Sequence, residues 1–265
     1  MRQYFACSDI HSFYDEWMLA LIAAKFDRNN PNHILIICGD LFDRGNQSSD
    51  CFDFVKQLQK ENRLIYIRGN HEDLLLDCIY ALQHAHNIHS VDITNGTVKT
   101  IANITKLTDY DVCFRTFDPT LFDKQIEPLV NFIENNSVDY FELGDAVFVH
   151  GWVPSTCDEN RVMIVHDNWR DGGWKQARWD NGMEQFHFEL IPPDKSTIVC
   201  GHWHTSFGWS YYAHEGSEFG EDAKFDPFIQ YNKTHTSQIV ALDACTAHTR
   251  KVNCVVFDET GKILY

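Results

Sequence analysis

The stretch ICGDLFDRGN, residues 37–46, places two aspartates, an arginine and two glycines directly after an apolar run. The preceding residues 34–37 are apolar at every position, which is typical of a strand buried on both faces in a parallel sheet. Open α/β sheets bind their ligands at the carboxyl ends of such strands. The stretch therefore predicts a buried strand that ends in a functional site.

Strands and helices alternate along the first third of the chain, which predicts a mainly parallel sheet with right-handed crossovers. The expected strands are residues 3–7, 33–38 and 63–67, and the expected helices are residues 15–26, 48–61 and 72–82.

Later in the chain the pattern changes to strands separated by loops, which indicates a second, mixed sheet. Its expected strands are residues 139–143, 146–150, 196–200, 237–243 and 251–258. Residues 84–140 are expected to form a partly helical insertion, with a helix at 121–136. We therefore predict an α/β fold, a four-layer α/β/β/α sandwich of two mixed sheets flanked by helices, in a single domain over residues 1–265.

Charge and cysteine content narrow the class of protein. The net charge of −16 argues against a nucleic-acid groove and against an anionic membrane surface, because both need clustered Lys and Arg. The nine cysteines include no CxxC pair, which favours reduced core thiols over disulfides or zinc. The sequence has no apolar stretch of about 18 residues and no signal-like N-terminus. We expect a soluble, cytoplasmic protein.

Five predicted strands end in the same kinds of polar residue. The motifs are DIH (Asp9, His11), GDLFDRG (Asp40, Asp43, Arg44), GNHE (Asn70, His71), HG (His150) and GHWH (His202, His204). Each motif alone is compatible with an ordinary turn. Five of them in order, each at a strand end, indicate one shared site.

The chemistry that fits these residues is a centre of two divalent metal ions. Hard cations prefer carboxylate, imidazole and amide oxygen ligands, and the motifs contain no thiolate. Two cations need a ligand that bridges them, and Asp40, the first acid of its cluster, is the expected bridge. The expected ligands are Asp9, His11 and His204 for one metal, and Asn70, His150 and His202 for the other.

This set of motifs closely resembles the calcineurin-like metallophosphoesterases. GDLFDRG with RGNHE is most similar to the branch of serine/threonine protein phosphatases and their bacterial or phage relatives. The resemblance implies the four-layer sandwich and two metals, Mn²⁺ first, with Fe or Zn as alternatives. The metal assignments match the family pattern residue by residue. Ser12 departs from it, since many members have glycine after the D-x-H motif.

The expected mechanism is direct attack on phosphorus by a hydroxide that bridges the two cations. His71 is the expected general acid for the leaving alkoxide, and Asp43 is expected to orient it. Arg44 and Asn70 are expected to contact the phosphate. The resemblance further implies a second phosphate-binding arginine, for which Arg178 is the candidate and Arg170 the reserve. Either arginine could instead be a surface residue stacked on tryptophan.

Three functions remain open. The first is a phosphatase of phosphomonoesters such as phosphoserine or phosphothreonine. The second is a hydrolase of nucleotides or dinucleoside polyphosphates such as diadenosine tetraphosphate. The third, a non-catalytic scaffold, is disfavoured because every expected ligand type and His71 are present. The expected partner is a phosphorylated protein or a nucleotide substrate. The aromatic residues between 203 and 212 could line its pocket or belong to the core.

Overall fold

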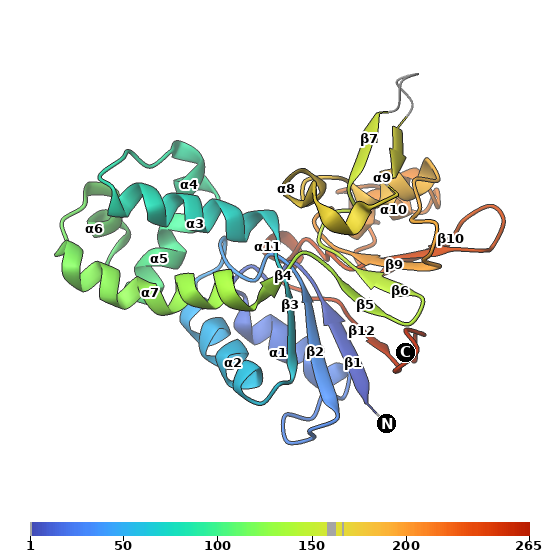
Figure 1. The fold of residues 1–265 in the computed structure, drawn as a ribbon, viewed down its shortest axis with the longest axis horizontal. Coiled ribbons are helices and arrows are strands. Elements are labelled where there is room, and N and C mark those ends of the chain that lie inside the picture. The colour runs from blue at the N-terminus through green and yellow to red at the C-terminus, as the bar shows by residue number, and fades with distance from the viewer. Residues whose placement is uncertain (1, 158–162, 166) are drawn as a thin grey trace.

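The first sheet has the strand order β12–β1–β2–β3–β4 in the computed structural model, which describes residues 2–157, 163–165 and 167–265 (Figure 1). β1 to β4 are parallel, and β12 is antiparallel to β1. Cys38 pairs with Ile67, so neighbouring strands end together at the carboxyl edge. The strands are Gln3–Cys7 (β1), His33–Cys38 (β2), Leu64–Ile67 (β3), Ser137–Val138 (β4) and Cys254–Phe257 (β12).

The second sheet has the order β10–β11–β9–β6–β5. Its three central strands are parallel, and each edge strand is antiparallel to its neighbour. Both sheets are therefore mixed, as predicted. The strands are Phe141–Leu143 (β5), Ala146–Phe148 (β6), Thr197–Cys200 (β9), Phe228–Tyr231 (β10) and Gln238–Ala241 (β11). A separate hairpin consists of Ser155–Cys157 (β7) and Met163–Val165 (β8).

The prediction that residues 251–258 belong to the second sheet is wrong. This segment forms β12, which pairs with β1 in the first sheet. Val255 and Phe257 point into the core between the sheets, whereas Val256 packs on the helical side. Its apolar pattern suits an edge of either sheet, because both sheets share that central core.

Helices cover the outer face of each sheet, which gives the predicted four layers (Figure 1). α2 is amphipathic, and Cys51, Val55 and Leu58 bury one face against the first sheet. The helices beside the first sheet are Tyr14–Ala23 (α1), Ser48–Lys60 (α2) and Asn70–Gln83 (α3). Those beside the second sheet are Trp174–Ala177 (α8), Gly182–His187 (α9) and Thr205–Tyr211 (α10). Two short helices are Trp169–Asp171, a 3₁₀ turn, and Thr246–Thr249 (α11).

The insertion between α3 and β4 is mostly helical and, together with α3, forms a lobe beside the first sheet (Figure 1). Its helices are Ser90–Thr94 (α4), Thr97–Thr105 (α5), Asp109–Phe114 (α6) and Pro119–Asn136 (α7). No helix among the described residues is long and apolar enough to cross a membrane. The nine cysteines all lie in the described ranges and are free thiols.

Candidate metal centre and active site

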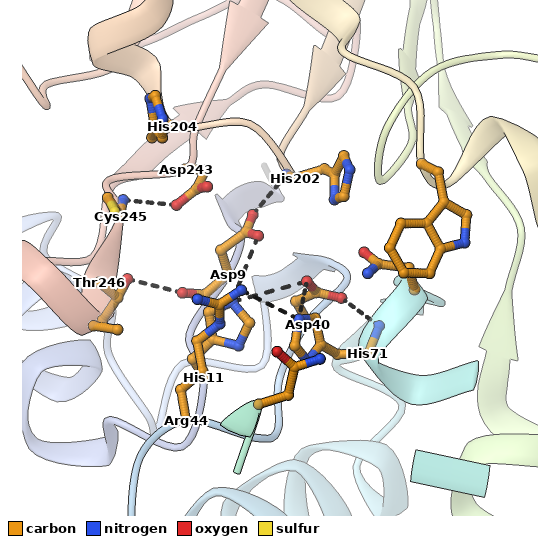
Figure 2. Close-up of a pocket in the computed structure, with 14 residues that line it drawn as sticks. Asp9, His11, Asp40, Arg44, His71, His202, His204, Asp243, Cys245 and Thr246 are labelled. Atoms are coloured by element: carbon orange, nitrogen blue, oxygen red, sulfur yellow. Dashed lines mark hydrogen bonds and ion pairs between the residues drawn. The ribbon is translucent and has the colours of Figure 1, made fainter. Parts of the chain in front are cut away.

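The loops after β1, β2, β3, β9 and β11 converge at one edge of the two sheets, around a cavity of about 250 Å³ (Figure 2). His150, which follows β6, lies beside Asp40 at the same edge. Because parallel strands end at the same edge, residues from distant parts of the chain meet there. The backbone N–H of His202 donates to Asp9 Oδ2 at 2.9 Å, across 193 positions of sequence.

Several loop residues have left-handed backbone, with φ between +52° and +72°: Asp9, His11, Asp40, Asp43, Arg44 and His202. This conformation costs a non-glycine residue about 1–2 kcal/mol, so the surrounding structure must hold it. Backbone hydrogen bonds do so, since His11 N–H donates to the carbonyl of Asp40 at 3.0 Å. Clustered backbone strain of this kind is typical of functional sites.

Asp40 lies at the centre, and its two carboxylate oxygens face different histidines. Oδ2 is 3.8 Å from His11 Nε2 and 3.9 Å from His71 Nε2, whereas Oδ1 is 3.3 Å from His150 Nε2. Two groups of donor atoms share Asp40, and within each group the atoms lie within 4.8 Å of one another: His11, Asp40 and His71, and Asp40, His150 and His202. This geometry suits a carboxylate that bridges two cations.

Hydrogen bonds hold two of these histidines in the form that binds metal. His11 Nδ1 donates to the carbonyl of Phe42 at 3.0 Å, and His150 Nδ1 donates to the carbonyl of Cys38 at 2.8 Å. Each bond leaves Nε2 free to ligate. His150 Nε2 also lies 2.8 Å from Asn70 Oδ1, so the two predicted ligands converge. The donor set therefore fits hard divalent cations.

The glycine before Asp40 allows the backbone of this loop to pass close to the ring of His150, a predicted metal ligand. Gly39 has φ +83°, and a Cβ there would overlap the His150 ring. Glycine suits such a position because it has no Cβ and adopts positive φ easily.

His204 lies apart from these two groups (Figure 2). It lines the same cavity, but its Nε2 is 3.3 Å from Glu218 Oε1 and its Nδ1 is 3.2 Å from Ser206 Oγ. Its role as a metal ligand stays a prediction.

The pKa values separate His71 from the other histidines of the site. Burial lowers the pKa of His11 to about 3 and that of His202 to about 4, and it also lowers the pKa of His150. A neutral imidazole is the form that ligates a metal. Burial acts in the same direction on His71, but Asp40 and Asp43 outweigh it and raise its pKa above the usual 6.5. His71 therefore differs from the other histidines in the direction of its pKa shift, as the predicted general acid requires.

The carboxylates of the site also differ from one another in the direction in which their pKa values are shifted. Burial would raise the pKa of Asp40, but the surrounding histidines, His150 first, outweigh burial and hold that pKa below its usual range. Burial, followed by the charges of Asp243 and Asp40, raises the pKa of Asp9 well above its usual value. Burial raises the pKa of Asp243 to about 6. The centre thus holds a surplus of buried acid that cations would balance.

His71 and Asp43 form a buried pair in which His71 Nδ1 lies 2.8 Å from Asp43 Oδ2. The contact places the proton on Nδ1 against the carboxylate and leaves Nε2 facing the cavity. Arg44 Nη2 is 3.4 Å from that Nε2. The predicted general acid, its predicted orienting carboxylate and the Arg44 guanidinium are thus adjacent.

Arg178 and Arg170 lie outside the cavity. Arg178 is buried and forms ion pairs with Asp139 and with Asp73, the latter at 2.7 Å. Arg170 pairs with Glu142 at 2.6 Å and with Asp194. Arg44 is the arginine that lines the cavity among the residues described. A phosphate role for Arg178, with Arg170 in reserve, stays a prediction that these ion pairs disfavour.

Sequence reasoning missed part of the cavity wall. Asp243, Cys245 and Thr246 follow β11, and Asn95 and Trp179 come from loops. Asp243 could have been found, because it ends a predicted strand as the other site residues do. The aromatic run 203–212 contributes mainly α10, which packs beside the core of the second sheet.

Sequence comparison agrees with this geometry. The calcineurin-like phosphoesterase family matches residues 3–206, a segment that contains every predicted metal ligand. The chain belongs to this family. It is by class a metal-dependent phosphoesterase with a site built from histidine and aspartate.

Two relatives of the chain are named for different activities. The asymmetrical bis(5′-nucleosyl)-tetraphosphatase of Anoxybacillus flavithermus is 34% identical over 100 residues, which are 36% of this chain and 38% of that protein. Serine/threonine-protein phosphatase 1 of Salmonella typhimurium is 34% identical over 76 residues, 29% of this chain and 32% of that protein. The chain thus spans about a third of the length of either curated relative.

A solved structure shares the fold along the whole chain. A cold-active protein tyrosine phosphatase matches 99% of this chain and 78% of its own, with a TM-score of 0.52 and 13% identity. At this identity the likeness shows the fold alone.

Proposed function

We propose that this phosphoesterase is a metal-dependent phosphatase of phosphomonoesters, with phosphoserine or phosphothreonine in proteins as its substrate. The observation that carries the proposal is the placement of Asp40, His71 and Arg44 in one cavity. A bridge for two cations, a proton donor and a phosphate-binding cation are what phosphoester hydrolysis needs. The resemblance to serine/threonine-protein phosphatase 1 supports this substrate class.

The residues that would hold the metals are Asp9, His11, Asp40, Asn70, His150, His202 and His204. Bound divalent cations, Mn²⁺ first and Fe or Zn as alternatives, would supply Lewis-acid charge at the phosphoryl oxygens and would acidify water. The hard oxygen and imidazole donors support that choice of metals.

The chain's own residues handle the proton and the phosphate. His71 donates the Nε2 proton to the leaving alkoxide, while Asp43 holds Nδ1–H and stabilises the imidazolium. Arg44 binds non-bridging phosphate oxygens through its guanidinium fork, and Asn70 contributes a further contact.

The test is phosphate release in Mn²⁺ buffer from a phosphoserine peptide and, in parallel, from diadenosine tetraphosphate with a coupling phosphatase. We expect faster turnover on the peptide and none in either assay after chelation. Faster turnover on the nucleotide would overturn the substrate assignment but retain the phosphoesterase. No turnover on either substrate with metal bound would favour a scaffold.

One observation favours the second candidate, a dinucleoside-polyphosphate hydrolase. Trp179 lines the cavity with 45% of its surface exposed, and an exposed indole can stack on a nucleobase. The resemblance to the bis(5′-nucleosyl)-tetraphosphatase points the same way. If this candidate is right, W179A weakens the nucleotide reaction and spares the peptide reaction. F188A is the matched control, because Phe188 is exposed and lies outside the cavity lining.

We also propose a cytoplasmic location. The nine free thiols support it, since thiols persist in reducing compartments.

A further inference from the structure

The buried carboxylate of Asp43 receives hydrogen bonds from the helical insertion as well as from His71. Thr97 Oγ1 donates to Asp43 Oδ2 at 2.8 Å, and Thr100 Oγ1 donates to Asp43 Oδ1 at 3.1 Å. Asp43 and both threonines are completely buried. Two of the three side-chain donors to this carboxylate therefore come from α5, a helix outside the motifs that form the metal centre.

The direction of the Thr100 bond follows from its other partners. Asp43 N–H donates to Thr100 Oγ1 at 3.0 Å, and Ser48 Oγ–H donates to the same atom at 3.4 Å. With its lone pairs so engaged, the Thr100 hydroxyl has its own hydrogen free for the carboxylate. Asp43 is thus held through both its main chain and its side chain.

The same insertion also contacts the neighbouring arginine. Arg44 N–H donates to the carbonyl of Asn95 at 2.8 Å. Gly96 has φ +84°, and a Cβ there would lie 2.6 Å from Arg44 N, so the two backbones are in direct contact. The segment 95–100 therefore supports two adjacent residues of the predicted active site, Asp43 and Arg44.

We propose that Thr97 and Thr100 are positioning residues for the general acid: they hold Asp43 in the orientation that aims His71 at the leaving group. The inference rests on the proposed phosphatase function, because it assigns the threonines a role in leaving-group protonation. It makes the helical insertion part of the catalytic apparatus.

The physical reason is the cost of leaving a buried polar group without partners. Thr97 and Thr100 donate to different oxygens of the Asp43 carboxylate, so together they fix its orientation toward His71 Nδ1. Without these two donors the carboxylate is free to turn away from His71. The imidazole then loses the partner that aims its Nε2 at the leaving group.

Valine is nearly isosteric with threonine but cannot donate, whereas serine keeps the donor. We would therefore measure T97V, T100V, T97S and T100S with two substrates in Mn²⁺. A phosphoserine peptide releases an alkoxide, which needs a proton, whereas p-nitrophenyl phosphate releases a phenolate that leaves without one. We expect the valine variants to lose about tenfold in kcat on the peptide, to lose little on p-nitrophenyl phosphate, and to be restored by serine.

T105V is the matched control, because Thr105 is a buried threonine of the same helix whose hydroxyl donates to Ile101 O. It should leave both rates unchanged. Bound Mn²⁺ and melting temperature are measured for every variant. Equal losses on both substrates, or losses that persist in the serine variants, would overturn the inference. If T97V fails to fold, T100V provides the same test on the other carboxylate oxygen.

H71N separates this inference from the function on which it rests. H71N should retain metal and lose about 10²-fold or more on the phosphoserine peptide, with a smaller loss on p-nitrophenyl phosphate. If H71N behaves so and the valine variants match the wild type, the role of the threonines alone is wrong. If H71N itself shows no difference between the substrates, both the acid assignment and the inference fail.

Discussion

Ser12 occupies a position where the backbone favours glycine. Its φ is +60°, a conformation that costs a residue with a Cβ about 1–2 kcal/mol. Two hydrogen bonds offset this cost: Ser12 N–H donates to the carbonyl of Leu41 at 2.8 Å, and its hydroxyl lies 2.9 Å from Ser48 Oγ. Serine in place of the family's glycine therefore has a less favourable backbone conformation but gains a buried hydrogen bond through its side chain.

Gly201 provides a direct test of the prediction that Asp9 is a metal ligand. A Cβ at this residue would overlap Ser8 Oγ and Asp9 Oδ2. We expect G201A to displace the Asp9 carboxylate and to lower the metal content per chain, measured by mass spectrometry after dialysis against Mn²⁺. G172A is the control, because a Cβ there meets nothing within 4 Å. Wild-type metal content in G201A would contradict the placement of Asp9 as a ligand.

Helices and strands with a regular pattern of apolar residues could be predicted from the sequence. β1 and β2 begin and end at the predicted residues, and α2 differs by one residue at its end. The motifs at their ends were recognisable because strand ends converge. The sheet to which β12 belongs could not be predicted, since Val255 and Phe257 face a core common to both sheets.

The contribution of the insertion was not predictable either. Thr97 and Thr100 lie within an ordinary helical pattern, and 54 and 57 positions of sequence separate them from Asp43. Their meeting depends on how α5 packs between the other helices, which no local pattern encodes.

β2 begins at His33, whose titration we expect to lower stability in acid. Burial, beside the Phe5 ring, lowers the pKa of His33 below 6.5, although Asp27 acts in the opposite direction. Since the unfolded chain then binds the proton more readily, His33 adds stability above pH 6.5 that is lost as the pH falls.

The variant H33N keeps a hydrogen-bond acceptor for Asp27 N–H, which donates to His33 Nδ1 at 2.9 Å. Urea unfolding at several pH values should show a shallower acid loss in H33N than in the wild type. Parallel pH profiles would show that His33 does not carry this effect.

For the whole molecule, the core between the sheets connects its two halves. Residues from both sheets, such as Ile36 and Phe148, belong to one buried cluster. A single domain over residues 1–265 stays a prediction, which this shared core supports. The predicted metal centre lies at the edge where both sheets end, so the buried charges there influence the stability of both sheets.

We expect metal removal to destabilise the entire fold. Asp9 and Asp243 are buried acids whose pKa values are raised, and bound cations would relieve their cost. Ligand binding at a hundred times Kd adds about 2.7 kcal/mol, which for a chain of this size corresponds to about 5–10 °C in Tm. Calorimetry with and without chelator measures the difference.

D40N is the control for this experiment, because it alters the central carboxylate while keeping its shape. Its Tm should respond little to Mn²⁺. A wild-type Tm that chelation leaves unchanged would show that the cations do not bind at this centre.

The pairing of β1 with β12 has a consequence for how the metal centre assembles. Cys7, two residues before Asp9, pairs with Cys254, which is 247 positions later in the sequence. Thr246 Oγ1, which donates to the carbonyl of Asp9, is 237 positions from it. Contacts between such distant segments form slowly because a long loop must close first. The Asp9 loop therefore reaches its final geometry only after long-range pairing, and we expect the metal centre to form late in folding.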